Sequence, residues 1–173
     1  TNSSISSGKI IKPRRTDVLY DMKQSEIGDI DIVAEDGTNI FSFLRFYRTD
    51  FIDFDFSSYR EDLNKSWKIH KYETGSLEIS TDEDTNKYAE LEATYLKAKN
   101  GAANVGDSKA ASEFFLLERI YQRKYQEIQM INSDDNRDSL KHMYNYMSSW
   151  LFNLTCGYGE RPFRTVSFGV SII

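Results

Sequence analysis

Cysteine and histidine, two residue types that often serve as nucleophiles and metal ligands, are scarce in this sequence. The single cysteine, Cys156, can form no disulfide within the chain, which is typical of a reducing compartment. The two histidines, His70 and His142, lie far apart, and with one cysteine they do not make a zinc site. Cys156 follows His142 by fourteen residues, roughly 20 Å along one helix, which is too far for a Cys–His catalytic pair. We therefore predict no enzyme activity and no catalytic, metal-binding or cofactor-binding residues.

Long apolar runs and Gly-rich phosphate loops are also missing. A membrane-spanning helix needs about 20 consecutive apolar residues, and no stretch of the sequence supplies them. No signal peptide is predicted, because no apolar stretch follows the basic residues near the N-terminus. The segment GYGE lacks the third glycine of a dinucleotide-binding loop. The missing initial Met and the final apolar run suggest a piece of a longer protein.

The charge is spread unevenly along the chain. The net charge is −5, with +4 over residues 1–15, −11 over residues 16–92 and +2 over residues 93–173. No basic patch extends over a whole domain, so we predict no nucleic-acid partner. Residues 1–15, TNSSISSGKIIKPRR, are Ser-rich and basic, and we interpret them as a flexible leader. Contact with an anionic membrane or an acidic partner is the alternative.

Residues 16–82 are predicted to be a β-rich region with an unusual aromatic spacing. The segment IGDIDIV, followed by Asp36-Gly37, indicates a hairpin or two short strands. Four phenylalanines then recur every five residues, a period that belongs to neither a helix nor a plain strand. They are Phe41, Phe46, Phe51 and Phe56. A period of five suits a square coil with inward-pointing Phe side chains, and residues 39–58 resemble about one coil of a pentapeptide-repeat protein. The alternative is an aromatic-rich β-hairpin packed on the helices.

Residues 83–164 are predicted to be helical. Apolar residues at helical spacing indicate a pair of helices over residues 82–131, with GAANVGD as the turn and Asp107 or Ser108 as the cap of the second helix. A short turn makes the pair antiparallel, and its small Ala residues resemble a tetratricopeptide-like unit. A third helix is expected to pack through an apolar stripe formed by Leu140, Met143, Tyr144, Met147, Trp150, Leu151 and Leu154. The predicted fold class is therefore α+β, with a small aromatic-rich β region packed on an antiparallel three-helix, tetratricopeptide-like bundle.

A stiff corner is predicted after the third helix. Gly157 and Gly159 can adopt the positive φ of a helix end, and Pro162 prevents a simple continuation. Residues 165–173 are apolar again, and we interpret them as the start of a possible membrane segment. The candidate interaction motif consists of Cys156, Gly157, Tyr158, Gly159, Glu160, Arg161, Pro162 and Arg164. Glu113 or Glu118 is expected to pair with Arg161 and hold the corner.

Two segments together resemble a known family. They are ASEFF, Ala111–Phe115, and CGYGERPFR, Cys156–Arg164. They resemble archaeal and bacterial pentapeptide-repeat proteins in which a helical region precedes an ion-channel-like membrane domain. Leu44–Phe51 and the following FDFSSYREDL also look like this group, so that the resemblance spans roughly residues 39–173. CGYGERP is its specific part, and Phe163 stands where the family has Trp. It implies a cytosolic portion ahead of a membrane segment that begins near Val166, with Arg161 and Arg164 just inside the membrane.

The leading functional hypothesis is a non-catalytic interaction or regulatory module. It would lie in the cytoplasm at the inner face of the cell membrane and couple a protein partner to a membrane domain. One alternative is a soluble partner-binding protein in which Val166–Ile173 belongs to the core. The other is an enzyme or toxin whose site the sequence does not reveal.

Overall fold

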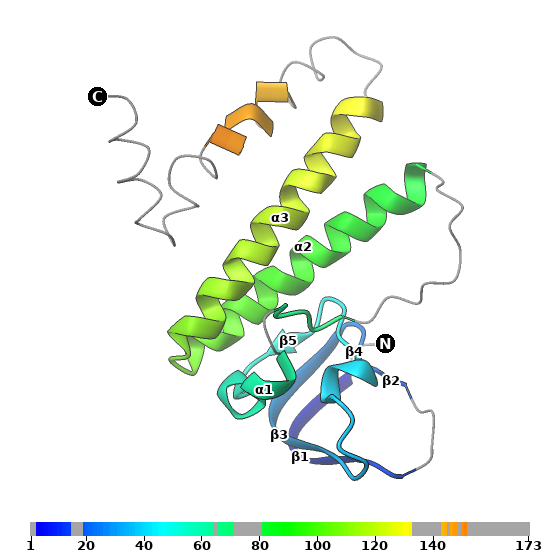
Figure 1. The fold of residues 1–173 in the computed structure, drawn as a ribbon, viewed down its shortest axis with the longest axis vertical. Helices are drawn as coiled ribbons and strands as arrows, with labels where there is room; N and C mark the ends of the chain where they lie inside the picture. The colour runs from blue at the N-terminus through cyan, green and yellow to red at the C-terminus, as the bar shows by residue number, and fades with distance from the viewer. Residues whose placement is uncertain are drawn as a thin grey trace. The chain divides into compact units, whose positions relative to one another are not determined.

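The computed structural model describes residues 3–14, 19–63, 66–70, 81–132, 143–144, 146–148 and 150–151 (Figure 1). Side chains of the two long helices are described from Lys87 to Gln129. The chain forms two compact units. Unit 1 comprises Thr1–Glu78 and Glu90–Glu118, and unit 2 comprises Ile79–Ala89 and Arg119–Ile173.

Unit 1 contains two small sheets whose strands, within the described residues, all pair in parallel. The larger sheet has the order β1–β3–β5, formed by Ser3–Lys12, Ser25–Ala34 and Asp50–Phe51. The smaller sheet pairs β2, Tyr20–Asp21, with β4, Leu44–Arg45. Paired residues are 22 positions apart between β1 and β3 and 24 apart between β2 and β4. The chain therefore passes alternately through the two sheets.

Strand β3 is the central strand of the larger sheet, and its side chains alternate between the core and the solvent. Ile27 and Ile32 are buried, while Asp31 is exposed. The alternation shifts at Gly28, which is buried directly after Ile27. A Cβ atom at Gly28 would collide with the backbone carbonyl of Ser6 on β1. Glycine at this position therefore lets β1 and β3 approach each other closely.

Two long helices follow the β region: α2 over Thr81–Asn104 and α3 over Ser108–Asn132. Helix α2 ends in a Schellman motif, in which Gly106 adopts a φ of +80° and donates its N–H to the Ala103 carbonyl at 3.1 Å. The Asp107 N–H completes the motif by donating to the Ala102 carbonyl at 2.8 Å. The turn is therefore only Val105–Asp107, and α2 continues through most of the segment that was predicted to be a turn.

Helix α2 closes one end of the larger sheet within unit 1 (Figure 1). A Cβ atom at Gly101 would lie 2.5 Å from both the Cβ and the carbonyl oxygen of Phe51 on β5. One turn earlier, the Lys97 ammonium forms an ion pair of 2.5 Å with Asp50. We call β5, with Lys97 and Gly101 against it, the capped end of the sheet.

An aromatic cluster fills the core of unit 1. Short helical segments carry part of it: η1 over Ile40–Ser42, η2 over Phe56–Tyr59 and α1 over Arg60–Leu63. The Phe54 ring stacks on Tyr59 with centroids 5.3 Å apart, and Phe56 meets Phe114 of α3 edge to face at 4.7 Å. The Tyr59 hydroxyl donates to the Ile30 carbonyl at 3.2 Å and accepts from the Ile32 N–H at 2.9 Å. The cluster therefore joins both the sheet and α3.

Unit 2 contains the other ends of the two long helices. Tyr88 stacks on Tyr121 with ring centroids 6.3 Å apart, and the Lys124 ammonium lies 5.4 Å from the Tyr88 ring centroid. Residues 143–144, 146–148 and 150–151 are helical, in the segment where the third helix was predicted.

The predicted fold class is wrong. The described residues give a mixed α+β fold with parallel strands in two small sheets, without the antiparallel pair that a hairpin would form. Residues 39–58 contain η1, β4, β5 and most of η2, and they form no pentapeptide-repeat coil. The period of five does mark buried side chains, since all four phenylalanines are at most 6% exposed. The short strands β4 and β5, the second of which contains Phe51, instead pair with residues 24 positions away, a relation that no local spacing reveals.

Candidate functional site

The strongest candidate site is the outer edge of β1. Strand β1 lies at one edge of the larger sheet and pairs with β3 over its whole length, from Ser3↔Ser25 to Lys12↔Ala34. No other strand of the described residues pairs with β1. We call the side of Ser3–Lys12 that faces away from β3 the open edge. A ten-residue strand that pairs on one side only, among the described residues, is a template on which another extended segment can pair.

Two columns of apolar side chains end at the open edge. Ile5 of β1 lies beside Ile27 of β3, and Ile10 lies beside Ile32. The β3 members of these pairs are 0% and 3% exposed, whereas Ile5 and Ile10 are half-buried. The Ile5–Ile27 column continues to Phe51 of β5, and both columns are incompletely covered at β1.

Charged side chains of β1 and β3 are matched across the pair. The Lys9 ammonium lies 3.0 Å from the Asp31 carboxylate, and both side chains are more than half exposed. The buried Lys12 forms an ion pair with Asp36, and this partner holds the pKa of Asp36 well below its usual range. Lys9 is therefore the one charged side chain of β1 that stays accessible from the solvent.

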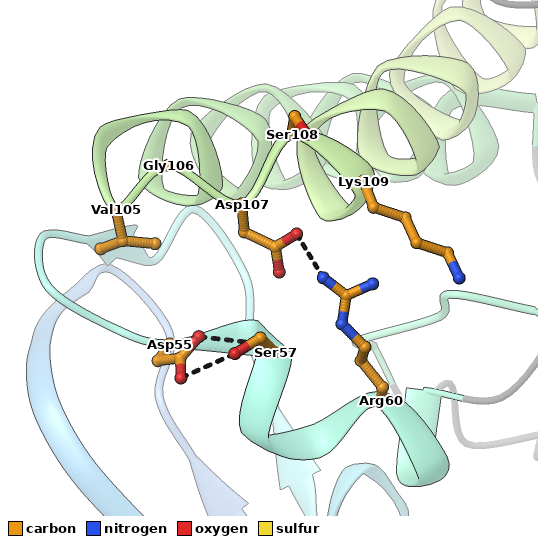
Figure 2. Close-up of a pocket in the computed structure, with 8 residues that line it drawn as sticks. All are labelled: Asp55, Ser57, Arg60, Val105, Gly106, Asp107, Ser108 and Lys109. Atoms are coloured by element: carbon orange, nitrogen blue, oxygen red, sulfur yellow. Dashed lines mark hydrogen bonds and ion pairs between the residues drawn. The ribbon is translucent and has the colours of Figure 1, made fainter.

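A second candidate is a cleft of about 260 Å³ in unit 1, between η2–α1 and the α2–α3 turn. Figure 2 shows Asp107 projecting from the turn toward Arg60 of α1, with Lys109 beside it. Asp107 Oδ1 lies 2.7 Å from the Arg60 guanidinium and accepts from the Ala110 N–H at 3.0 Å, whereas its buried Oδ2 has no hydrogen-bond partner among the described residues. Asp107 therefore caps α3 and fastens α1 to the turn.

The other carboxylate of the cleft, that of Asp55, also caps a helix. Asp55 caps η2, accepting from the Ser57 N–H and the Ser57 hydroxyl, each at 2.9 Å. These hydrogen bonds, led by that of the Ser57 side chain, lower the pKa of Asp55. Both carboxylates thus act as helix caps.

The residues of the predicted motif, Cys156–Pro162 and Arg164, lie outside the described residues, as do His142 and the apolar run after residue 164. Among the other singled-out residues, His70 Nδ1 is 2.7 Å from the Tyr95 hydroxyl, and its half-buried ring packs on Tyr95. Glu118 forms an ion pair of 2.7 Å with Lys99 of α2. Both residues therefore contribute contacts between elements of unit 1.

The apolar stripe predicted on the third helix is exposed where the structure describes it. Its five described side chains are all between 42% and 73% exposed: Met143, Tyr144, Met147, Trp150 and Leu151. The expectation that this face packs is therefore not met by these five side chains.

The open edge was missed by sequence reasoning because residues 1–15 were interpreted as a flexible leader. The structure forms a strand over Ser3–Lys12 instead. One signal was present: Ile5 and Ile10 have the same five-residue spacing as Ile27 and Ile32, with which they pair.

Comparison of the chain with protein-family models, with curated proteins and with solved structures finds no match. In the part of the chain that the structure describes, no helix has the length and apolarity needed to cross a membrane. The same residues contain no group of three or more His, Cys, Asp or Glu side chains that could hold a metal ion.

Proposed function

We propose that this chain is a non-catalytic module that binds a partner protein. The observation that carries the proposal is the difference between the two outer strands of the larger sheet, β5 and β1. The capped end is covered by α2, with Gly101 against Phe51. The open edge leaves β1 without a second strand partner among the described residues and leaves two isoleucines half-buried, while the Ile11 carbonyl near the end of β1 accepts a hydrogen bond from the Tyr20 hydroxyl at 3.2 Å. Free strand edges are used for protein recognition because their main-chain groups supply affinity and their side chains supply selectivity.

The proposal extends to the cellular location. We propose that the module acts in the cytoplasm at the inner face of the cell membrane. The support is the sequence resemblance of Cys156–Arg164, in which Arg161 and Arg164 precede the apolar residues that begin at Val166.

Site-specific photo-crosslinking in the source cells tests partner binding. A photoreactive residue at Ser7, which is exposed at the middle of β1, should give a crosslinked partner, whereas one at the exposed Asp53 should not. The purified partner should then bind the purified chain, and Ile5→Lys should weaken this binding at least about tenfold because a charge would enter the apolar column. Identical crosslinks at Ser7 and Asp53, or binding that Ile5→Lys leaves unchanged in a variant that still folds, would contradict the proposal.

A further inference from the structure

We infer that the open edge receives an extended partner segment as an additional parallel strand, with two apolar side chains five residues apart and an acidic side chain directly before the second. This inference rests on the proposed function, and it specifies which kind of partner segment fits.

The spacing of the apolar side chains follows from the columns in the sheet. Residues an odd number of positions apart point to opposite faces of a regular strand. Ile27 and Ile32 are five apart, yet both are buried, because the alternation of β3 shifts at Gly28. Strand β1 matches β3 residue by residue, so its Ile5 and Ile10 share the same spacing. A segment that continues both columns must therefore carry apolar side chains at that spacing.

The direction of the added strand follows from the position at which the side-chain alternation of β3 changes, Gly28. Gly28 comes one residue after the first column position of β3, at Ile27, and four residues before the second, at Ile32. A parallel segment can reproduce this asymmetric arrangement along its length. In an antiparallel segment with the same pattern, the change in side-chain alternation would lie next to the Ile10–Ile32 column instead of the Ile5–Ile27 column. Over part of the edge, its apolar side chains would then point to the solvent face of the sheet. A parallel segment also continues the pairing seen in every strand pair of the described residues.

The acidic position follows from Lys9. Neighbouring strands lie about 4.8 Å apart, and Lys9 already pairs with Asp31 on the β3 side. The residue at the matching position of an added strand would face Lys9 from the other side. Asp31 directly precedes Ile32 in β3, so the added segment should likewise carry its acid directly before the second apolar residue. A basic residue there would place like charges directly opposite each other, which is unfavourable.

A synthetic peptide with the sequence of residues 25–34, SEIGDIDIVA, is a suitable probe because it has this pattern. We expect saturable binding by fluorescence anisotropy, together with slower amide hydrogen exchange along β1. Replacing the peptide's second Asp, the counterpart of Asp31, with Lys should weaken binding about three- to tenfold. The protein variant Lys9→Glu should reverse this preference, whereas Lys68→Glu, the same change at another exposed lysine, should leave it unchanged.

A spin label at the N-terminus of the peptide reports direction. In a parallel complex it should broaden the amide signals of Ser3 and Ser4, and in an antiparallel complex those of Ile11 and Lys12. Antiparallel binding, or binding without the charge preference, overturns the inference but leaves partner binding at this edge in place. No saturable binding up to about 1 mM peptide also overturns the inference. The proposed function fails separately, if crosslinking at Ser7 yields no partner.

Discussion

Replacing Gly101 with alanine has two effects of opposite sign on the stability of the fold. In a helix interior, alanine is more favourable than glycine by about 1 kcal/mol, so an α2 that touched nothing at this position would become more stable. The structure places Gly101 against β5, where an added Cβ would lie 2.5 Å from the Cβ and from the carbonyl oxygen of Phe51. The carbonyl belongs to the backbone of β5 and cannot rotate away without disturbing the strand.

The steric effect should win. Overpacking in a tight core costs about 1–3 kcal/mol, and Phe51, which is 3% exposed, packs on the rings of Phe46 and Phe56. We therefore expect Gly101→Ala to lower the free energy of unfolding by up to about 2 kcal/mol after the propensity gain of about 1 kcal/mol is subtracted from the cost of overpacking. Urea unfolding followed by circular dichroism and by tryptophan fluorescence measures this change.

The matched control lies two residues further along α2. Ala103 is exposed, so Ala103→Gly should show the propensity effect alone, a loss of about 1 kcal/mol. If Gly101→Ala instead raised the stability by a similar amount, α2 would not approach β5 as described. The account of the capped end would then be refuted.

Three further changes test other parts of the fold. Tyr59→Phe should cost about 1–3 kcal/mol in urea unfolding, because it leaves a buried N–H and a buried carbonyl of β3 without their partner; an unchanged stability would contradict this role. Asp107→Asn should keep the cap of α3, whereas Asp107→Ala should cost about 1–2 kcal/mol more; equal losses would rule out capping as the reason for this residue. Three carboxyl groups have lowered pKa values in the folded protein, each chiefly through a hydrogen bond from one side chain. The pairs are Asp21 with Arg45, Asp36 with Lys12 and Asp55 with Ser57. Their stabilisation is present above the unfolded-state pKa of about 3.9 and is lost as the pH falls toward the lower folded-state values. Stability measured from pH 7 to pH 3 should therefore decline below about pH 5, and Asp21→Asn should reduce that decline.

The helices were predictable because the signals for a helix are local. The apolar spacing of α2 and α3 lies within each segment, and Gly106 and Asp107 mark the end of one helix and the start of the next. The end of α2 was placed too early because GAAN reads as a turn. In the structure, Gly101 serves close packing on β5, and Ala102 and Ala103 accept the hydrogen bonds of the Schellman motif.

The sheets were not predictable from local pattern. Each strand pair joins residues 22 or 24 positions apart, and neither the spacing of charges nor that of apolar residues within one segment specifies such a partner. Strand β1 shows the difficulty most clearly, because SSISSGKIIK is polar and Ser-rich. Its structure depends on β3, against which Ile5 and Ile10 find apolar neighbours and Lys9 finds Asp31.

The open edge is a better candidate for function than the cleft, for a reason of chemistry. In the cleft, Asp55 and Oδ1 of Asp107 already accept capping hydrogen bonds, so binding a ligand through these atoms would compete with the local fold. At the open edge, pairing with a further strand would compete with no strand pair of the described residues. Long free edges are usually protected by charges or proline, yet Ser3–Lys12 contains no proline and two charged residues, of which Lys12 is buried in its ion pair with Asp36 and Lys9 is accessible. A single accessible lysine leaves most of the edge able to pair while favouring an acidic neighbour. The edge therefore combines general affinity, from the backbone, with selectivity at one position.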